Sequence, residues 1–100
     1  MRTKKTPEEV RMAALKVLEM EMADLMGRER SPAWLCRARE AVTGAMYNLS
    51  IYQPSYPELG RLTGKRHHTT SLDQVRRYNR DWPPILRIQW EDAVERQLNA

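Results

Sequence analysis

The sequence predicts an all-α fold: a small bundle of five to six helices that contains a helix-turn-helix. Three observations predict it. Apolar residues recur three or four positions apart in several stretches, which is the spacing of one helix face. These stretches are bounded by Ser, Thr, Pro or Gly, the residues that start and stop helices. No stretch alternates apolar and polar residues for long enough to form a strand.

Length and composition favour one small basic domain. The chain has 100 residues, of which 41% are hydrophobic, enough for a core but too few for an additional nucleotide-binding domain. The net charge of +4 is compatible with a nucleic-acid partner, although ribosomal, membrane-surface and ordinary soluble proteins share it. We expect residues 1–6 to form a flexible basic tail and residues 7–100 to form the single domain.

Cysteine content and hydropathy indicate in which cellular compartment the protein is expected. Cys36 is the single cysteine, which excludes an intramolecular disulfide and a cysteine-based zinc site and fits a reducing compartment. The basic first residues are not followed by an apolar run, so we expect no signal peptide. No stretch approaches the ~20 apolar residues of a membrane span. We therefore expect a cytoplasmic protein that binds no membrane and that is associated with the bacterial nucleoid if it binds DNA.

Three helices are expected in the first half of the chain. The first begins with a capping box formed by Thr6 and Glu9. A short second helix covers residues 22–26. After a polar loop, a long helix begins at Ser31 and Pro32, a cap followed by proline. Its apolar face consists of Trp34, Leu35, Ala38, Ala41, Val42, Ala45, Met46 and Leu49.

The helix-turn-helix is expected over residues 56–79. A capping box at Ser55 begins a short helix that ends at Gly64, a residue suited to left-handed backbone. The second helix of the motif begins near His67 or His68. The expected core of the motif consists of Leu59, Leu62, Leu72 and Val75.

A last helix follows the break at residues 81–84 and carries apolar residues to the end of the chain. We expect Trp34, Trp82 and Trp90 to lie in the core, because an all-helical fold offers no flat sheet on which single-stranded bases stack. Cys36 is expected to be a small buried or half-buried residue.

The turn and the start of the second motif helix concentrate side chains that suit duplex DNA. A helix N-terminus presents unpaired N–H groups and a positive dipole end to phosphates. Hydroxyl and imidazole groups hydrogen-bond base edges, and a Thr methyl or Pro57 packs against a thymine methyl. The alternative is that Thr69 or Thr70 merely caps the helix. The side chains concerned are Lys65, Arg66, His67, His68, Thr69 and Thr70.

Catalysis and metal binding find little support. His67 and His68 have no Cys or carboxylate at ligand spacing, and adjacent residues point differently on a helix, so we expect no metal and no cofactor. There is no Gly-rich phosphate loop and no evident nucleophile–base or carboxylate pair. We therefore expect a protein that is not an enzyme and has no small-molecule substrate.

The same region of the sequence resembles a known protein family. Residues 57–60, Pro-Glu-Leu-Gly, and residues 64–72, Gly-Lys-Arg-His-His-Thr-Thr-Ser-Leu, resemble the signature of the C-terminal DNA-binding domain (domain IV) of the bacterial replication initiator DnaA. Residues 23–30 are similar to a helix and basic loop of that family, and residues 37–46 to its next helix. The similarity covers most of residues 8–98 in order.

The resemblance implies how DNA would be bound. In the family the second motif helix enters the major groove, and an Arg of the basic loop enters the adjacent minor groove. Arg30, or less well Arg28, matches this minor-groove residue. Arg76 follows the recognition helix, and phosphate contact or a solvated position suits it equally. The other matched positions are Arg39, Pro57, Arg66, His68, Thr69 and Thr70.

The sequence departs from the family at several positions. His67 stands where the family has an Asp, which leaves the preferred base open because a His can donate. Lys65 replaces a Gly of the turn and adds a positive charge. Glu40 replaces a Gln, and a carboxylate there would repel phosphate. We expect a stand-alone domain without the ATPase of the initiator, so the resemblance does not imply initiation of replication.

These observations lead to one expected function and one alternative. We expect a sequence-specific binder of double-stranded DNA that acts by occupying sites, as a transcriptional regulator or a replication-control factor. We expect it to be a monomer or a weak dimer. The alternative is a protein–protein interaction module that kept the fold.

Overall fold

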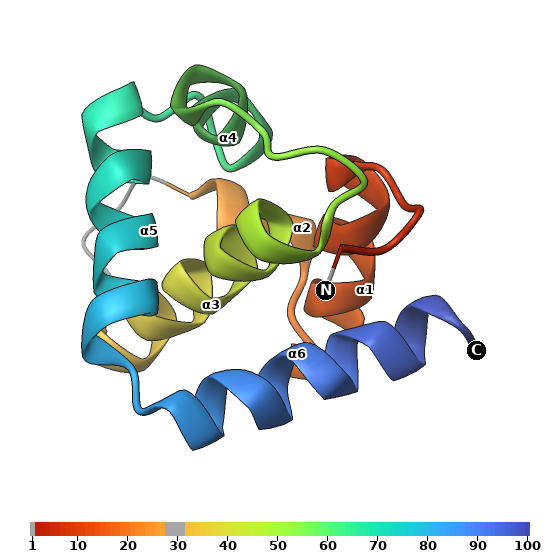
Figure 1. Cartoon of the computed structure of the whole chain (residues 1–100). Helices are drawn as coiled ribbons and strands as arrows, with labels where there is room; N and C mark the ends of the chain where they lie inside the picture. The colour runs from red at the N-terminus through yellow and green to blue at the C-terminus, as the bar shows by residue number, and fades with distance from the viewer. Residues whose placement is uncertain (1, 28–31) are drawn as a thin grey trace.

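The computed structural model describes residues 2–27 and 32–100, and this part of the chain is all-helical, as predicted. It folds into a compact body of about 33 × 26 × 24 Å without a strand in the described residues (Figure 1). Its helices are α1 (Pro7–Leu18), α2 (Met22–Met26), α3 (Ala33–Leu49), α4 (Tyr56–Leu62), α5 (His68–Asp81) and α6 (Pro84–Leu98).

Helix α3 is the centre of the fold. It packs against α1, α4, α5 and α6, which surround it in Figure 1. The residues of α3 that face the core recur at helical spacing, as the sequence predicts. The fully buried core includes Val10, Leu25, Val42, Ala45, Met46, Leu49, Leu59 and Val94.

The two predicted capping boxes have different outcomes. At α1 the box is complete: the Glu9 N–H donates to Thr6 Oγ1 at 3.2 Å, and the Thr6 N–H donates to Glu9 Oε1 at 3.1 Å. At α4 the Glu58 N–H donates to Ser55 Oγ, but the Glu58 carboxylate accepts from the Tyr52 hydroxyl at 2.6 Å. The second box is therefore half formed, because a tyrosine competes for the carboxylate.

The N-terminal residues are not the free tail that we expected. The Thr3 N–H donates to Leu49 O, and the Ile51 N–H donates to Lys5 O, both at 2.7 Å. The Arg2 guanidinium donates to Tyr47 O at 2.9 Å. The physical reason is that the last carbonyls of a helix have no partner within it. Arg2 and Thr3 supply these partners at the end of α3, and Lys5 accepts from the residue that follows it.

A polar cluster holds the C-terminal half of α5. A Cβ on Gly44 would lie 2.3 Å from Cγ of Tyr78, so α3 and α5 meet at a distance that only glycine allows. The Tyr78 hydroxyl donates to Glu91 Oε2 at 2.6 Å, and Asn48 Nδ2 donates to the same oxygen at 3.1 Å. Burial, followed by the hydrogen bond to Glu91, raises the pKa of Tyr78 well above its usual value. The cluster joins α3, α5 and α6.

Candidate nucleic-acid interface

Helices α4 and α5 form the predicted helix-turn-helix, with a tight turn between them. The Arg66 N–H donates to Gly60 O at 2.9 Å, and a Cβ on Gly60 would lie only 2.2 Å from Arg66 O. Gly64 has a φ of 110° and packs against the backbone of Met26. The positive φ expected at Gly64 is confirmed, and Gly60 allows the turn to approach α4 closely.

Lys65 also lies in the left-handed region, with a φ of 57°. This conformation costs a residue with a Cβ about 1–2 kcal/mol. The resembled family has a Gly at this position, which adopts such a φ without strain. Lys65 is exposed, so the chain carries a positive charge at a turn position where the backbone favours glycine.

His67 caps the first turn of α5. Its Nδ1 accepts from the Thr69 N–H at 3.2 Å and lies 2.7 Å from Thr69 Oγ1. Its ring lies over that of His68, with 4.1 Å between the centroids. The predicted helix start is confirmed, but the alternative that Thr69 or Thr70 caps the helix is wrong, because the imidazole fills that position.

The outer face of α5 is exposed along its whole length, and α5 lies at the edge of the molecule in Figure 1. Thr69, Asp73 and Arg76 follow one another at helical spacing on this face, and Arg80 continues the row. His68 is exposed beside them, whereas Thr70 is half-buried. The structure thus brings several predicted site residues together on one surface.

Asp73 is a residue of this surface that the sequence interpretation missed. It stands four positions after Thr69 and three before Arg76, so helical spacing alone would have found it. Its carboxylate lowers the positive charge of the face. It can also accept a hydrogen bond from the amino group of cytosine or adenine in the major groove.

Arg39 and Arg66 face the end of α2. Arg66 Nη2 donates to Leu25 O at 3.0 Å and to Gly27 O at 2.7 Å, and its Nε donates to Thr63 O at 2.9 Å. Arg39 is buried, and its Nε and Nη2 donate to Asp24 O at 3.1 and 2.7 Å.

These contacts give Arg39 an internal role in place of the expected phosphate role, and they occupy part of the Arg66 guanidinium. The last carbonyls of α2 have no helical partner, and guanidinium groups satisfy them. Arg39 belongs to the interior, and a phosphate contact would require breaking its hydrogen bonds, so it is left out of the candidate surface. Arg66 is half-buried and keeps only part of its side chain for solvent.

Of the remaining predicted site residues, the structure describes Pro57 but not the arginines of the basic loop. Pro57 is exposed in the first turn of α4, as a groove contact requires. Arg30 and its alternative Arg28 lie outside the described residues. The expectation of a minor-groove contact therefore rests on the sequence alone.

The Glu40 carboxylate, which the sequence suggested would repel phosphate, is bound within the fold. It accepts from Arg77 Nε at 2.9 Å and from Trp82 Nε1 at 2.8 Å. Its negative charge is therefore compensated within the fold, where it ties α3 to the end of α5.

A second surface of note is apolar. Trp34 is 62% exposed and lines a cavity of about 500 Å³ between α1, α3 and α6. On α6, Ile85 and Ile88 are 61% and 57% exposed, and their exposed neighbour Leu86 lines the cavity. Trp82 and Trp90 are half-buried and line this cavity. The prediction of a core position is wrong for Trp34, because the first turn of α3 is largely exposed, whereas its later turns are covered by other helices. The expectation for Cys36, which is exposed on the same turn, is wrong for the same reason.

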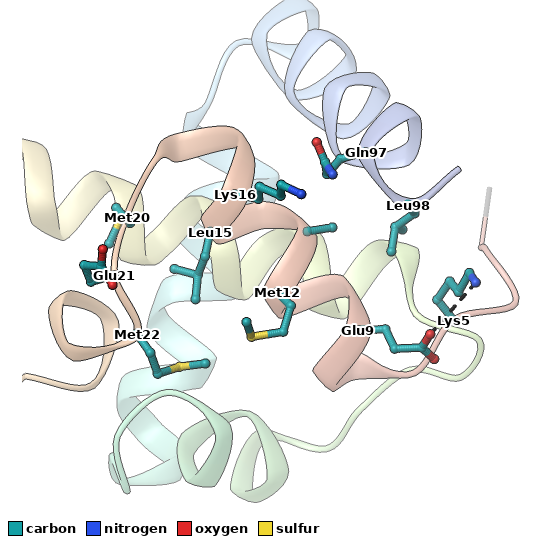
Figure 2. Close-up of a pocket in the computed structure, with 11 residues that line it drawn as sticks. Lys5, Glu9, Met12, Leu15, Lys16, Met20, Glu21, Met22, Gln97 and Leu98 are labelled. Carbon is teal, nitrogen blue, oxygen red and sulfur yellow. Dashed lines mark ion pairs between the residues drawn. The ribbon is translucent and has the colours of Figure 1, made fainter. Parts of the chain in front are cut away.

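Another cavity, of about 600 Å³, lies between α1, the segment that follows it and the end of α6 (Figure 2). Its apolar lining includes Met12, Met20 and Met22, and an ion pair between Lys5 and Glu9 stands at its rim. The sequence interpretation did not foresee it. Among the described residues, no group of three or more His, Cys, Asp or Glu side chains is placed to hold a metal ion.

The helices were also compared with the requirements of a membrane span, and the chain with known proteins. Within residues 2–27 and 32–100, no helix has both the length and the apolar character that crossing a bilayer requires. Comparisons with protein-family models, with curated proteins and with solved structures find no match for this chain.

Proposed function

We propose that this protein binds double-stranded DNA in a sequence-specific manner and acts by occupying its sites, as a transcriptional regulator or a replication-control factor in the cytoplasm. The observation that carries the proposal is the exposed first turn and outer face of α5, where His68, Thr69 and Arg76 lie together after a tight turn that carries Lys65. A helix presented in this way can place its N-terminal residues in the major groove. The resemblance to DnaA domain IV supports the same function.

The side chains of this face would have different roles toward DNA, some contacting phosphates and others contacting bases. Lys65 and Arg76 are exposed cations that would neutralise phosphates. His68 and Thr69 would read base edges, each good contact discriminating by about 1–3 kcal/mol. Pro57, exposed at the start of α4, would pack against a thymine methyl or the groove wall.

The proposal is tested by measuring duplex affinity over a series of salt concentrations. Duplexes are first selected from a random pool, and binding is then followed by fluorescence anisotropy. The logarithm of the binding constant should fall linearly with the logarithm of the salt concentration, because counterions are released from the phosphates. Arg76→Ala should reduce the slope by about 1 and weaken all duplexes alike.

Arg96→Ala is the matched control, since it removes an exposed arginine from α6, away from the proposed surface. It should leave the slope unchanged. An absence of binding to any duplex at low salt would contradict the proposal. Equal effects of the two substitutions would contradict the assignment of α5 as the recognition helix.

A second candidate function, a protein–protein interaction module, is favoured by the apolar surface at the start of α6. Its partner would be a second copy of this chain. Ile85, Ile88 and Asp92 form one exposed row on α6, while the adjacent cavity is apolar and carries Arg37 on its lining. Each copy therefore offers both an apolar ridge with an acidic end and an apolar groove with a basic residue, the self-complementarity of a two-fold dimer.

Light scattering and duplex binding separate the two functions. A chain that dimerises in solution and binds no duplex would favour the second candidate. A chain that binds duplex with the expected salt dependence favours the first, whether or not it dimerises.

A further inference from the structure

The ring of His67 is fixed in position at the start of the candidate recognition helix. Its Nδ1 accepts from the Thr69 N–H at 3.2 Å and lies 2.7 Å from the Thr69 hydroxyl oxygen. One face of the ring lies over His68, with 4.1 Å between the centroids. A rotation of the ring would break the cap of α5 as well as the contact between the rings.

This geometry decides which hydrogen bond His67 can offer. A backbone N–H can only donate, so Nδ1 must accept and carries no proton. The proton of the neutral imidazole therefore lies on Nε2, which is a donor and not an acceptor. The side chain is exposed, and within the described part of the chain no hydrogen bond occupies Nε2.

We propose that His67 is a specificity-determining residue that favours guanine, and rejects cytosine, on the strand that faces the N-terminus of α5. In the major groove guanine presents two acceptors, N7 and O6, adenine (N7) and thymine (O4) present one each, and cytosine presents only the donor N4–H₂. A donor fixed at Nε2 therefore pairs best with guanine and opposes cytosine. The inference rests on the proposed function, which brings DNA to this helix.

A matched pair of substitutions tests the polarity of this contact. Asn and Asp have nearly the same shape and cap a helix equally well, since each has an oxygen that can accept from the Thr69 N–H. His67→Asn keeps a donor, the side-chain amide, for the groove. His67→Asp presents only acceptors. Comparing the two therefore changes the polarity while the cap is retained.

The experiment selects duplexes from a random pool with the unmodified protein and with each variant. The unmodified protein and His67→Asn should enrich guanine at one position of the site. His67→Asp should enrich cytosine at that position and leave the others unchanged. In direct binding measurements, exchanging the base pair should alter affinity by about ten- to a hundredfold in opposite directions for the two variants. Circular dichroism spectra should show the same helix content in all three proteins.

The outcomes separate this inference from the function on which it rests. If all three proteins enrich the same base at every position, His67 does not determine specificity, although the protein still binds DNA. If His67→Asn behaves as His67→Asp does, the donor argument is overturned. If the unmodified protein enriches no duplex, the proposed function fails, and the inference fails with it.

Discussion

At the scale of single residues, the turn of the motif combines charge with backbone strain. Lys65 adopts a φ of 57°, and the preceding Gly64 also has a positive φ, of 110°. The Cβ of the lysine destabilises the turn in this conformation. Under the proposed function, the positive charge next to α5 compensates for this, since it lies where a phosphate would pass.

Lys65→Gly should therefore stabilise the protein by about 0.5–1 kcal/mol, the relieved strain less the added entropy of the unfolded chain. Urea unfolding measures this difference. Lys65→Ala is the control, since it removes the same charge but keeps the Cβ, and it should give no gain. Both variants should bind duplex more weakly than the unmodified protein. An equal gain for Ala would show that strain is not the cause.

Arg39 also acts on stability. Arg39→Ala leaves the Asp24 carbonyl of α2 without its donors and should reduce the free energy of unfolding by about 1–3 kcal/mol. Arg37→Ala, an exposed neighbour on the same helix, should change it by less than about 0.5 kcal/mol. Urea unfolding of the two variants gives the comparison. A full loss of duplex affinity without loss of stability in Arg39→Ala would restore the phosphate role.

At the scale of helices, the end of α5 is held more firmly than its start. Tyr78 is buried against Gly44 of α3 and donates to Glu91 of α6, whereas the first turn of α5 is exposed. The helix is therefore anchored at one end and presented at the other. This arrangement gives the exposed residues a fixed frame, which lowers the entropy lost on binding.

The raised pKa of Tyr78 makes this anchor sensitive to alkali. The unfolded chain releases the phenol proton near pH 10, while the folded chain retains it. The stabilising effect is thus fully present below pH ~10 and declines as the pH rises above that value. Urea unfolding at a series of alkaline pH values should show a smaller decline for Tyr78→Phe. Tyr52→Phe, at an exposed tyrosine, is the comparison and should retain most of the decline.

At the scale of the whole molecule, the two candidate surfaces lie on different helices. The candidate recognition face runs along α5 from His68 to Arg80, and the residues proposed to read bases lie in its first turn. The apolar surface lies at the start of α3 and along α6 from Ile85, and α5 and α6 form different sides of the molecule in Figure 1. About 20 Å of helix separates the first turn of α5 from the start of α6. Under the two proposals, duplex binding and self-association would therefore use separate parts of the surface.

This separation predicts that the two properties can be changed one at a time. The double variant Ile85→Ser and Ile88→Ser should reduce self-association, measured by light scattering over a range of protein concentrations. It should leave the affinity for a duplex with a single site unchanged. A loss of affinity for that duplex, in a variant with an unchanged melting temperature, would show that the two surfaces are coupled.

The elements of the fold were predictable because their causes are local. The helical spacing of apolar residues, the cap at Thr6 and the positive φ at Gly64 each depend on neighbours in sequence. Each predicted helix is present in the described residues. The half-formed box at Ser55 was not predictable, since it depends on a hydroxyl six residues away from Glu58.

The candidate site was predictable only in part. The exposure of His68 and Thr69 follows from their place in the first turn of α5. The internal roles of Arg39 and Arg66 depend on where the end of α2 comes to lie, which is a tertiary contact. A resemblance in sequence matches an arginine without showing which carbonyl it meets.

The guanidinium of Arg66 has a mechanical consequence. It spans the carbonyls of Thr63 in the turn and of Leu25 and Gly27 at the end of α2. Two segments nearly forty positions apart in sequence are thereby hydrogen-bonded to one planar group, so a displacement of one segment also displaces the other. A ligand that moved the turn would therefore also move the end of α2.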